Sequence, residues 1–342
     1  MKKTVLVALS GGIDSSFAAY VMLKAGYNVI GVTLDLYGKN DFINAEKAAK
    51  FLGIKWYVAD YKKEFRHSVI SYFIKTYVDG KTPNPCAYCN KYAKFPFLYN
   101  EMLKNNASLI VTGHYAQMTS INGEKFINVP KDKKKDQTYY LALLDKDLLQ
   151  YIEFPLSNYL KEEIRDMARD INLPAAKIKD SQEICFLQGK DYRAFLVEML
   201  KKEKYRSGNF VLNGNVMGEH RGVPFYTIGQ RKGLGLKYHK ALYVAHIDVQ
   251  HNNIILKEDE PSLCRGVRLY DCNFFYESTK IEDVSVMLRY RMKKAKAKLE
   301  RLPFSKAHLL FDKPEILGTP GQIAAIYKED KLVGGGFIGG IF

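Results

Sequence analysis

The feature that most constrains this chain is a glycine-rich turn that joins a short apolar segment to an amphipathic one. Residues 5–9 are apolar and predict a buried strand, and Ser-Gly-Gly-Ile-Asp-Ser-Ser follows directly at residues 10–16. Gly11 and Gly12 can take positive φ and let the backbone approach an anion closely. The helix expected over residues 15–25 turns its unpaired N–H groups and its dipole toward the same place. This order of elements predicts a phosphate-binding site.

The spacing of this turn excludes two common nucleotide-binding motifs. Neither the Walker A pattern G-x-x-x-x-G-K-[ST] nor the dinucleotide fingerprint G-x-G-x-x-G occurs there. Ser-Gly-Gly-x-Asp-Ser-Ser instead resembles the PP-loop of the ATP pyrophosphatases, enzymes that split ATP to AMP and pyrophosphate while they activate an oxygen atom of their substrate. The resemblance implies ATP as a cosubstrate, with Mg²⁺ bridging its phosphates.

Composition limits the protein class. The 342 residues are 47% hydrophobic and 26% charged, which is typical of a soluble protein with two or three domains. No apolar run approaches the ~20 residues that span a bilayer, and the N-terminus does not resemble a signal peptide, so we expect a cytoplasmic protein without membrane contact. Five cysteines in so long a chain do not form a disulfide framework. The net charge of +15 points to a polyanionic partner, most simply a nucleic acid.

Residues 1–204 alternate short β-rich segments with helical ones, the pattern of a parallel sheet covered by helices, so the fold class is α/β. In such a sheet, ligands bind beyond the carboxyl ends of the strands, where Ser10, Asp35 and Gly113 would emerge together. We expect strands over residues 5–9, 29–34, 56–60 and 109–113, and helices over residues 15–25, 45–52, 64–78, 95–105, 161–171 and 192–202.

The pattern changes after residue 204. Glycine-rich, alternating stretches predict a small β-rich central module over residues 205–266. Residues 267–342 show short strands at regular spacing and no convincing helix, which favours a C-terminal β-barrel. We therefore expect three domains with limits near residues 204 and 266.

Basic residues cluster in two places, and the larger cluster contains an aromatic residue. Tyr290 among these cations suits a surface for RNA phosphates with a stacking side chain, although aromatic residues in strands are commonly core residues. A second run, at residues 131–135, lies in an expected loop. The larger cluster comprises Arg289, Arg291, Lys293, Lys294, Lys296, Lys298 and Arg301.

A proline-rich segment at residues 82–90 contains Cys86 and Cys89. Two prolines and an asparagine do not continue the preceding helix, so we expect a stiff surface loop that presents two thiols. Cys-x-x-Cys can be a redox pair, half of a zinc site or part of an iron–sulfur site. Cys264 and Cys272 lie outside the expected domain that contains Cys86 and Cys89, which disfavours a shared zinc site.

Several motifs together make a resemblance specific. In chain order they resemble the bacterial tRNA-specific 2-thiouridylases over nearly the whole chain, which implies 2-thiolation of the wobble uridine, position 34, in the tRNAs for Lys, Glu and Gln. Beyond the PP-loop, the motifs are Thr-Pro-Asn-Pro-x-x-x-Cys-Asn at 82–90, Thr-Gly-His-Tyr-Ala at 112–116, Lys-Asp-Gln-Thr-Tyr at 135–139, Asp-Ser-Gln-Glu-Ile-Cys-Phe at 180–186, Tyr-Thr-Ile-Gly-Gln-Arg-Lys-Gly at 226–233, Arg-Tyr-Arg at 289–291 and Pro-Gly-Gln at 320–322.

This resemblance also implies roles for individual residues. It makes Cys89 the nucleophile and Cys185 the carrier of a persulfide, and it makes the central module and the barrel contact tRNA. The implied ATP site comprises Ala8, Leu9, Ser10, Gly11, Gly12, Ile13, Asp14, Ser15, Leu34 and Gly113. The target base would lie beside Asn84, Pro85 and Cys86. The implied tRNA contacts are His114, Lys135, Asp136, Gln137, Arg289, Tyr290 and Gln322.

The chemistry that the resemblance implies is consistent with the reactivity of uracil. The 2-carbonyl of uracil is a poor electrophile, so ATP would first adenylate O2 and make AMP the leaving group for sulfur attack at C2. We expect a lowered thiol pKa near cations and helix N-termini, and a Cys89–Cys185 disulfide after sulfur release. The sulfur would come from a sulfur-relay protein, a cysteine desulfurase or free sulfide, and we expect the protein to act as a monomer.

One departure from the family pattern leaves a second mechanism open. Cys86 stands where the best-described branch has an acidic residue, so an acid/base role does not transfer to it. Cys86, Cys89 and Cys185 could instead hold a [4Fe–4S] cluster that binds sulfide at an open iron. Two other functions also stay open: an amidating PP-loop ligase, which needs no cysteine pair, and a non-catalytic RNA-binding protein that keeps ATP as a structural ligand.

Overall fold

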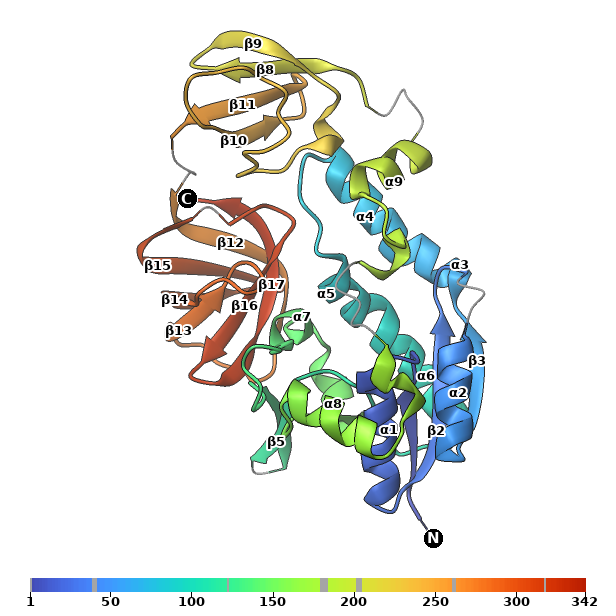
Figure 1. The fold of residues 1–342 in the computed structure, drawn as a ribbon. Coiled ribbons are helices and arrows are strands. Elements are labelled where there is room, and N and C mark those ends of the chain that lie inside the picture. Colours follow the sequence, from blue (N-terminus) through green and yellow to red (C-terminus); the bar gives the residue numbers. More distant parts are fainter. Residues whose placement is uncertain are drawn as a thin grey trace.

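Three β-sheets organise the chain (Figure 1). The structure, a computed structural model, describes residues 2–38, 42–121, 123–178, 184–200, 205–259, 263–316 and 318–342. A five-stranded sheet forms the N-terminal part, a four-stranded sheet the central module, and an eight-stranded sheet the C-terminal part. In Figure 1 the central module lies above the C-terminal sheet and beside the end of helix α4 (Ser71–Val78).

The N-terminal sheet is parallel, and helices cover both of its faces. Alternate residues of the central strand point to opposite sides, so Val5 packs with Phe17 on one face and Leu6 packs with Leu98 on the other. Both strand residues are fully buried for this reason. The strand order is β3 (Lys55–Asp60), β2 (Asn28–Asp35), β1 (Thr4–Ala8), β4 (Leu109–Val111) and β7 (Ile152–Glu153). The covering helices include α1 (Ile13–Lys24), α2 (Ile43–Leu52), α6 (Phe95–Lys104) and α8 (Lys161–Asp170).

The carboxyl ends of three strands meet at one edge of this sheet. Ala8 pairs with Val32, and Val7 pairs with Val111. The segments that follow β1, β2 and β4 therefore leave the sheet at the same edge, as the sequence predicts. The four predicted strands are present, and β7 was not predicted because it has two residues only.

The segment that carries Cys86 and Cys89 is helical, which corrects the loop expected there. Helix α5 (Pro85–Cys89) begins with proline at its first position, where the missing N–H costs nothing, and the Asn84 side chain caps it by accepting from the Ala87 N–H over 3.1 Å. A π-helical turn (Asn90–Lys94) then joins α5 to α6.

A second π-helical turn interrupts another predicted helix. The helix expected over residues 64–78 is present as α3 (Lys62–Phe65), the π-helical turn Arg66–Ile70 and α4. The remaining α-helices are α7 (Thr138–Leu141) and α9 (Tyr192–Met199). The predicted helix at 192–202 ends at Met199, and residues 201–204 lie outside the described ones.

The C-terminal sheet closes into an antiparallel barrel, as predicted, because β12 pairs with both β15 and β17. The barrel strands are β12 (Leu263–Phe274), β13 (Glu282–Met287), β14 (Ala295–Leu302), β15 (Lys306–Ile316), β16 (Ile323–Lys328) and β17 (Lys331–Ile341). A hairpin from the N-terminal part, β5 (Gln117–Ile121) and β6 (Glu124–Asn128), adds to the edge of β17. The predicted limits at 204 and 266 stay predictions, and this hairpin joins the barrel across them.

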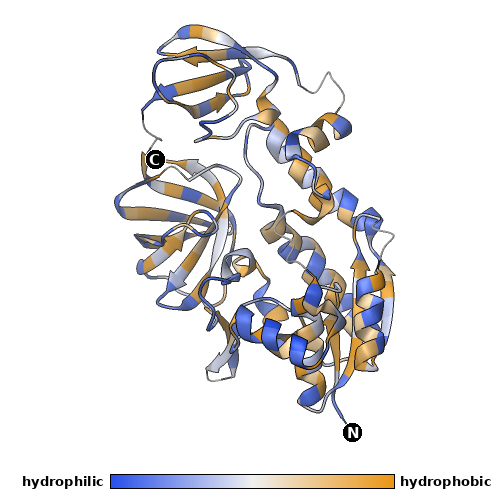
Figure 2. Ribbon diagram, in the orientation of Figure 1, coloured by the Kyte–Doolittle hydropathy of each residue, from blue (hydrophilic) through white to orange (hydrophobic). Residues whose placement is uncertain are grey.

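The central sheet has the order β10 (Leu242–Asp248), β11 (Asn253–Glu258), β8 (Gly208–Leu212) and β9 (Asn215–His220). Apolar and polar residues alternate along many strands of both β-rich parts (Figure 2), as one buried and one exposed face require. Within the described ranges, no helix has the length and apolar character that a membrane crossing requires.

Candidate active site

The PP-loop turn is closed by its own serine hydroxyls. Ser15 Oγ lies 3.0 Å from Ser10 Oγ, accepts from the Ser10 N–H over 3.2 Å and donates to the Gly12 carbonyl over 3.0 Å. Gly11 has φ +82°, and a Cβ at this position would lie 2.6 Å from the Ala45 backbone nitrogen, so only glycine fits. The first N–H groups of α1 have no side-chain cap among the described residues, which suits an anion.

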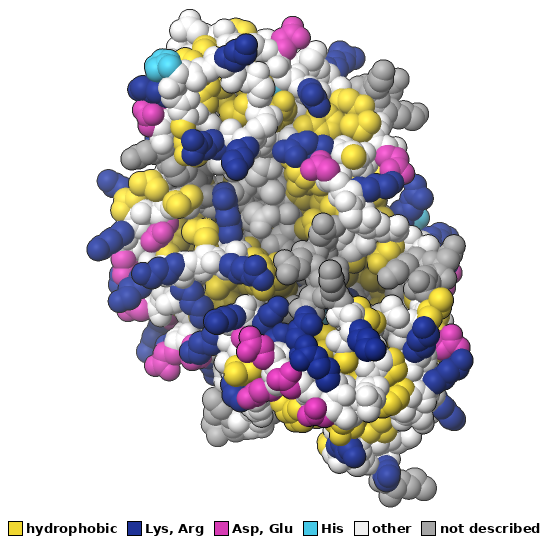
Figure 3. Space-filling view, in the orientation of Figure 1, with side chains coloured by type: hydrophobic (Ala, Val, Ile, Leu, Met, Phe, Trp, Pro, Cys, Tyr) yellow, Lys and Arg dark blue, Asp and Glu magenta, His cyan; other side chains and the backbone are white. Residues whose placement is uncertain are grey.

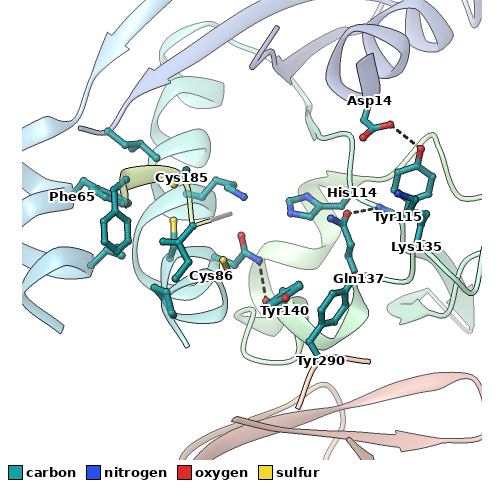
Figure 4. A pocket seen from close by; sticks show the side chains of 18 of the residues that line it. Asp14, Phe65, Cys86, His114, Tyr115, Lys135, Gln137, Tyr140, Cys185 and Tyr290 are labelled. Carbon is teal, nitrogen blue, oxygen red and sulfur yellow. Dashed lines mark hydrogen bonds between the residues drawn. The ribbon is translucent and has the colours of Figure 1, made fainter. Parts of the chain in front are cut away.

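Asp14 extends from the first turn of α1 into a cavity and is held from two sides (Figure 4). The Tyr115 hydroxyl donates to Asp14 Oδ1 over 2.8 Å, and the Lys161 ammonium donates to the same oxygen over 2.6 Å. Lys161 is buried at the start of α8, whereas the Asp14 side chain keeps 33% of its exposure. A carboxylate therefore faces the cavity with a buried cation behind it.

Other predicted ATP residues shape the backbone of this site. A Cβ on Gly113 would lie 2.8 Å from the Ser15 nitrogen, so glycine is required where β4 ends against the PP-loop. Leu9 and Ile13 are buried in the core, so their side chains anchor the loop. Ala8 ends β1, and Leu34 lies half-buried near the end of β2.

The three cysteines of the predicted chemistry lie at the opposite wall of the same cavity. Cys86 and Cys89 are one helical turn apart on α5, and Cys185 comes from a short 3₁₀ turn (Cys185–Leu187). Cys86 and Cys185 are open to the cavity, and Cys89 is buried. Asp180, Ser181, Gln182 and Glu183 of the same motif lie outside the described residues.

This cavity, of about 440 Å³, is lined by Asp14 of the predicted ATP site and by all three cysteines, whereas the other predicted ATP residues do not line it. It lies between the N-terminal part and the barrel, which contributes Tyr290 and Arg291 (Figure 4). Its volume is within the range of small-molecule sites. The lining residues are Asp14, Leu36, Phe65, Val69, Pro85, Cys86, Cys89, Asn90, Lys94, His114, Tyr115, Lys135, Gln137, Tyr140, Lys161, Ile184, Cys185, Phe186, Tyr290 and Arg291.

Burial raises the pKa of all three thiols, to about 11 for Cys86 and to about 12 for Cys185. Cys86 and Cys185 touch solvent in the cavity, but the surrounding walls displace most of the water that would stabilise a thiolate. The charge of Lys94 opposes this increase at each thiol. The expectation of lowered thiol pKa values is therefore wrong for the protein without ligands.

His114 and Gln137 form part of the wall between these two ends. Burial and the charge of Lys94 lower the pKa of His114 well below its usual value, so its imidazole is neutral. Its Nδ1 lies 2.6 Å from the Thr112 hydroxyl. Gln137 exchanges two hydrogen bonds of 2.9 Å with the Tyr115 backbone, one through its side chain and one through its N–H.

The neighbours of Gln137 point in different directions. Lys135 lines the cavity, whereas Asp136 accepts hydrogen bonds from the N–H and hydroxyl of Thr138 over 2.8 and 2.7 Å. Burial raises the pKa of Asp136. In this structure Asp136 therefore supports the start of α7 rather than the cavity wall.

One residue predicted to contact the target base and one predicted to contact tRNA join the barrel to α5. Asn84 and Gln322 are hydrogen-bonded to each other, and neither lines the cavity, whereas Pro85 and Tyr290 do. Arg289 is half-buried, donates to the Thr319 hydroxyl, and burial lowers its pKa.

Comparison with known proteins decides the family. Residues 3–189 match the family described as tRNA methyl transferase HUP domain, residues 193–258 its PRC-barrel domain, and residues 264–338 the aminomethyltransferase beta-barrel domain. The protein named tRNA-specific 2-thiouridylase MnmA of Carboxydothermus hydrogenoformans is 40% identical and covers 98% of each chain. The chain belongs to the tRNA-specific 2-thiouridylase family. Relatives of the same name from Persephonella marina and Acetivibrio thermocellus are 40% and 38% identical, over 98% of this chain and 99% of theirs.

The basic cluster of this thiouridylase-family member is not one continuous surface, which corrects the expectation from its sequence. The Arg301 side chain is only 9% exposed, because it lies against the rings of Phe274 and Tyr276 and pairs with Glu282 over 2.8 Å. Lys294 lies 3.6 Å above the Tyr327 ring, and Lys298 is 3.4 Å from Asp283. The alternation of β14 separates Arg301 from Lys296 and Lys298, because residues an odd number of positions apart point to opposite sides of a strand.

The second basic run has a more direct relation to the site. A hollow of about 530 Å³ adjoins the cavity and shares Lys135 and Lys161 with it. Lys131, Lys133, Lys134 and Arg165 also line this hollow. Figure 3 shows Lys and Arg side chains gathered across the middle of this face, beside the depression between the barrel and the N-terminal part.

Sequence analysis missed several residues that the thiouridylase fold brings into the cavity. Asn90 and Lys94 follow the cysteine helix at helical spacing, which could have indicated them. Tyr140 and Lys161 carry no recognisable local signal, because only the fold places them beside the cysteines and Asp14.

The three cysteines do not form a site for a single metal ion in this arrangement. Within residues that the structure describes, no three His, Cys, Asp or Glu side chains form a group that could hold a metal ion. Asp14 by contrast offers an open carboxylate at the PP-loop, and carboxylate oxygen is a ligand that Mg²⁺ prefers.

Proposed function

We propose that this protein catalyses the ATP-dependent 2-thiolation of the wobble uridine of tRNA, with Cys89 as nucleophile and Cys185 as persulfide carrier. One observation carries the proposal: the PP-loop carboxylate and three thiols line a single cavity. Full-length relatives named tRNA-specific 2-thiouridylases support it. The family description speaks of methyl transfer, but a cavity with three thiols favours sulfur transfer.

The two ends of the cavity would serve different steps of the reaction, adenylation and sulfur transfer. The serine-closed turn and the open N–H groups of α1 would bind the phosphates, together with the other predicted ATP residues at the ends of β1, β2 and β4. When bound beside Asp14, Mg²⁺ would neutralise phosphate charge. Adenylation of uracil O2 releases pyrophosphate and converts O2 into the leaving group AMP.

Sulfur transfer would then occur at the thiol end. The Cys89 thiolate attacks the inner sulfur of a Cys185 persulfide, so a Cys89–Cys185 bond forms and the outer sulfur leaves as sulfide with the electron pair. Sulfide attacks C2 of the adenylated uracil, and AMP departs. The Cys89 sulfur is oxidised and the outer sulfur is reduced, so an external reductant must reopen the disulfide before another turnover.

The substrate set is proposed from the same resemblance. The target base would enter beside Pro85 and Cys86, and the basic hollow at residues 131–135 supports contact with the tRNA backbone. We propose His114, Lys135, Asp136, Gln137, Arg289, Tyr290 and Gln322 as tRNA contacts, the tRNAs for Lys, Glu and Gln as substrates, and a relay protein or cysteine desulfurase as sulfur donor. With tRNA as substrate, the cytoplasm is the expected compartment.

Nucleoside analysis tests the function. Purified protein, ATP, Mg²⁺, a sulfur source and unmodified tRNA should give 2-thiouridine, AMP and pyrophosphate in equal amounts, measured by mass spectrometry of digested tRNA. An amidating ligase would form no 2-thiouridine, and a non-catalytic RNA-binding protein would release no pyrophosphate. Either result contradicts the proposal.

A further inference from the structure

We propose that Lys94 supplies the positive charge that balances the sulfur anion while the Cys89 thiolate displaces sulfide from the Cys185 persulfide. The inference rests on the proposed function, because it concerns the sulfur step of that reaction. It adds a residue that neither the PP-loop nor the cysteine motif includes.

The local helix geometry places Lys94 beside the thiols. It ends the π-helical turn Asn90–Lys94, which follows directly after Cys89. A π-turn bonds residues five positions apart, so the Lys94 N–H lies close to Cys89 and contributes to lowering the pKa of its thiol against burial. The Lys94 side chain lines the same cavity as the three cysteines. The N–H and the side chain of Lys94 therefore both lie at the thiol end.

Two carboxylates at or near the cavity are paired with other cations. Asp14 is bonded to Lys161 and Tyr115, and among the ion pairs of the described residues Lys94 has no carboxylate partner. Asp35, which like Cys185 acts on Tyr37, pairs with Lys62 over 3.0 Å. Within the described ranges, the remaining titratable or charged groups that face the thiols or line the cavity are Tyr37, His114, Lys135, Tyr140, Tyr290 and Arg291.

Lys94 is also the cation whose charge acts on the three thiols. Of the four cations that line the cavity within the described ranges, it is the one that lowers the pKa of Cys86, Cys89 and Cys185 against the effect of burial. It also disfavours a second positive charge on His114. Lys94 is half-buried. A partly buried cation without a carboxylate partner is stabilised by an anion, and thiolate or sulfide is the anion that this reaction generates nearby.

The positive charge of Lys94 must stabilise the negative charge both before and after the sulfur step. Before the step the negative charge lies on the Cys89 thiolate, and afterwards it lies on the departing sulfide, while the Cys185 sulfur exchanges its bond. An ammonium group near all three cysteines favours the charge in either position and costs no reorganisation during transfer.

Thiol alkylation of the complete, unliganded protein tests this role without tRNA. Iodoacetamide is reacted with wild type, Lys94→Met, Lys94→Gln, Lys94→Arg and the surface control Lys50→Met, and peptide mass spectrometry follows Cys86 and Cys185. At about pH 8, loss of the charge should slow both alkylations by about tenfold, because thiolate is the reactive form. Lys94→Arg and Lys50→Met should stay within about twofold of wild type.

Unchanged alkylation in a folded Lys94→Met or Lys94→Gln protein would overturn the role of Lys94, and equal slowing in Lys50→Met would do so as well. Thermal unfolding identifies variants that are not folded. Failure of the proposed function is a different result: wild type itself would form no 2-thiouridine, whatever the alkylation rates are.

Discussion

The Asn84 amide donates a hydrogen bond to Gln322 Oε1 over 3.3 Å and thereby joins the barrel to the helix that carries Cys86 and Cys89. Gln322 donates in turn to the Pro83 carbonyl over 2.7 Å. Asn84 also caps α5 through the Ala87 N–H. A barrel side chain thus holds the start of the segment that presents Cys86 and Cys89.

Gln322→Ala should weaken this connection. Loss of its hydrogen bonds should lower the free energy of unfolding by about 1–2 kcal/mol and reduce 2-thiouridine formation, because α5 loses its support. Urea unfolding and nucleoside analysis measure the two effects, with Gln150→Ala as an exposed control. Wild-type stability together with wild-type turnover would contradict the role assigned to this contact.

Asp14→Ala and Ser10→Ala should abolish thiolation and leave tRNA affinity near that of wild type. Both changes affect the PP-loop, whereas we propose that tRNA docks on the basic surface beside the cavity. Filter binding and nucleoside mass analysis separate the two properties, with Asp166→Asn as a surface control. Normal thiolation in either PP-loop variant would refute the nucleotide site.

Substitutions of the three cysteines should have unequal effects on 2-thiouridine formation. Cys89→Ser and Cys185→Ser should each eliminate 2-thiouridine, and Cys86→Ser should only reduce it, because Cys86 lies at the base site without taking part in the disulfide. Peptide mapping after turnover without reductant should find a Cys89–Cys185 disulfide. Equal loss in all three variants together with bound iron would instead support a [4Fe–4S] mechanism.

The raised thiol pKa values predict the pH dependence of alkylation. The pKa values of Cys86 and Cys185 are about 11 and about 12. The thiolate fraction of each should therefore increase about tenfold per pH unit between roughly pH 7 and 10. Alkylation should therefore rise through this range without a plateau. A plateau of the alkylation rate near pH ~9 would show instead that these thiols have ordinary pKa values.

Arg301→Met should destabilise the barrel rather than tRNA binding. It would leave Glu282 buried without its closest charge partner, at a cost of about 3 kcal/mol. Chemical unfolding should show this loss, and the salt dependence of tRNA binding should not change. In a folded protein, a tRNA salt slope reduced by about one unit would place Arg301 on the phosphate-binding surface after all.

The strands of the N-terminal sheet and the PP-loop were predictable because their signals are local. A buried strand, a positive-φ glycine and a helix N-terminus each depend on adjacent residues, so Ser10, Gly11 and Gly12 indicated their own conformation. The helix at residues 85–89 was mispredicted although its signals were also local. Proline at the first helical position and asparagine before it are helix-start residues, and they were interpreted only as helix breakers.

Local pattern therefore indicated the nucleotide turn and the α/β and β-barrel architecture, and the roles that family resemblance gives Cys89 and Cys185 stay predictions. The contacts of Lys161 and Arg301 could not be obtained in that way. A charged residue in a sequence carries no sign of whether it will face solvent, a thiol or a buried carboxylate. Its environment depends on segments a hundred or more residues distant, as with Asp14 and Lys161, and chain folding alone brings such segments into contact.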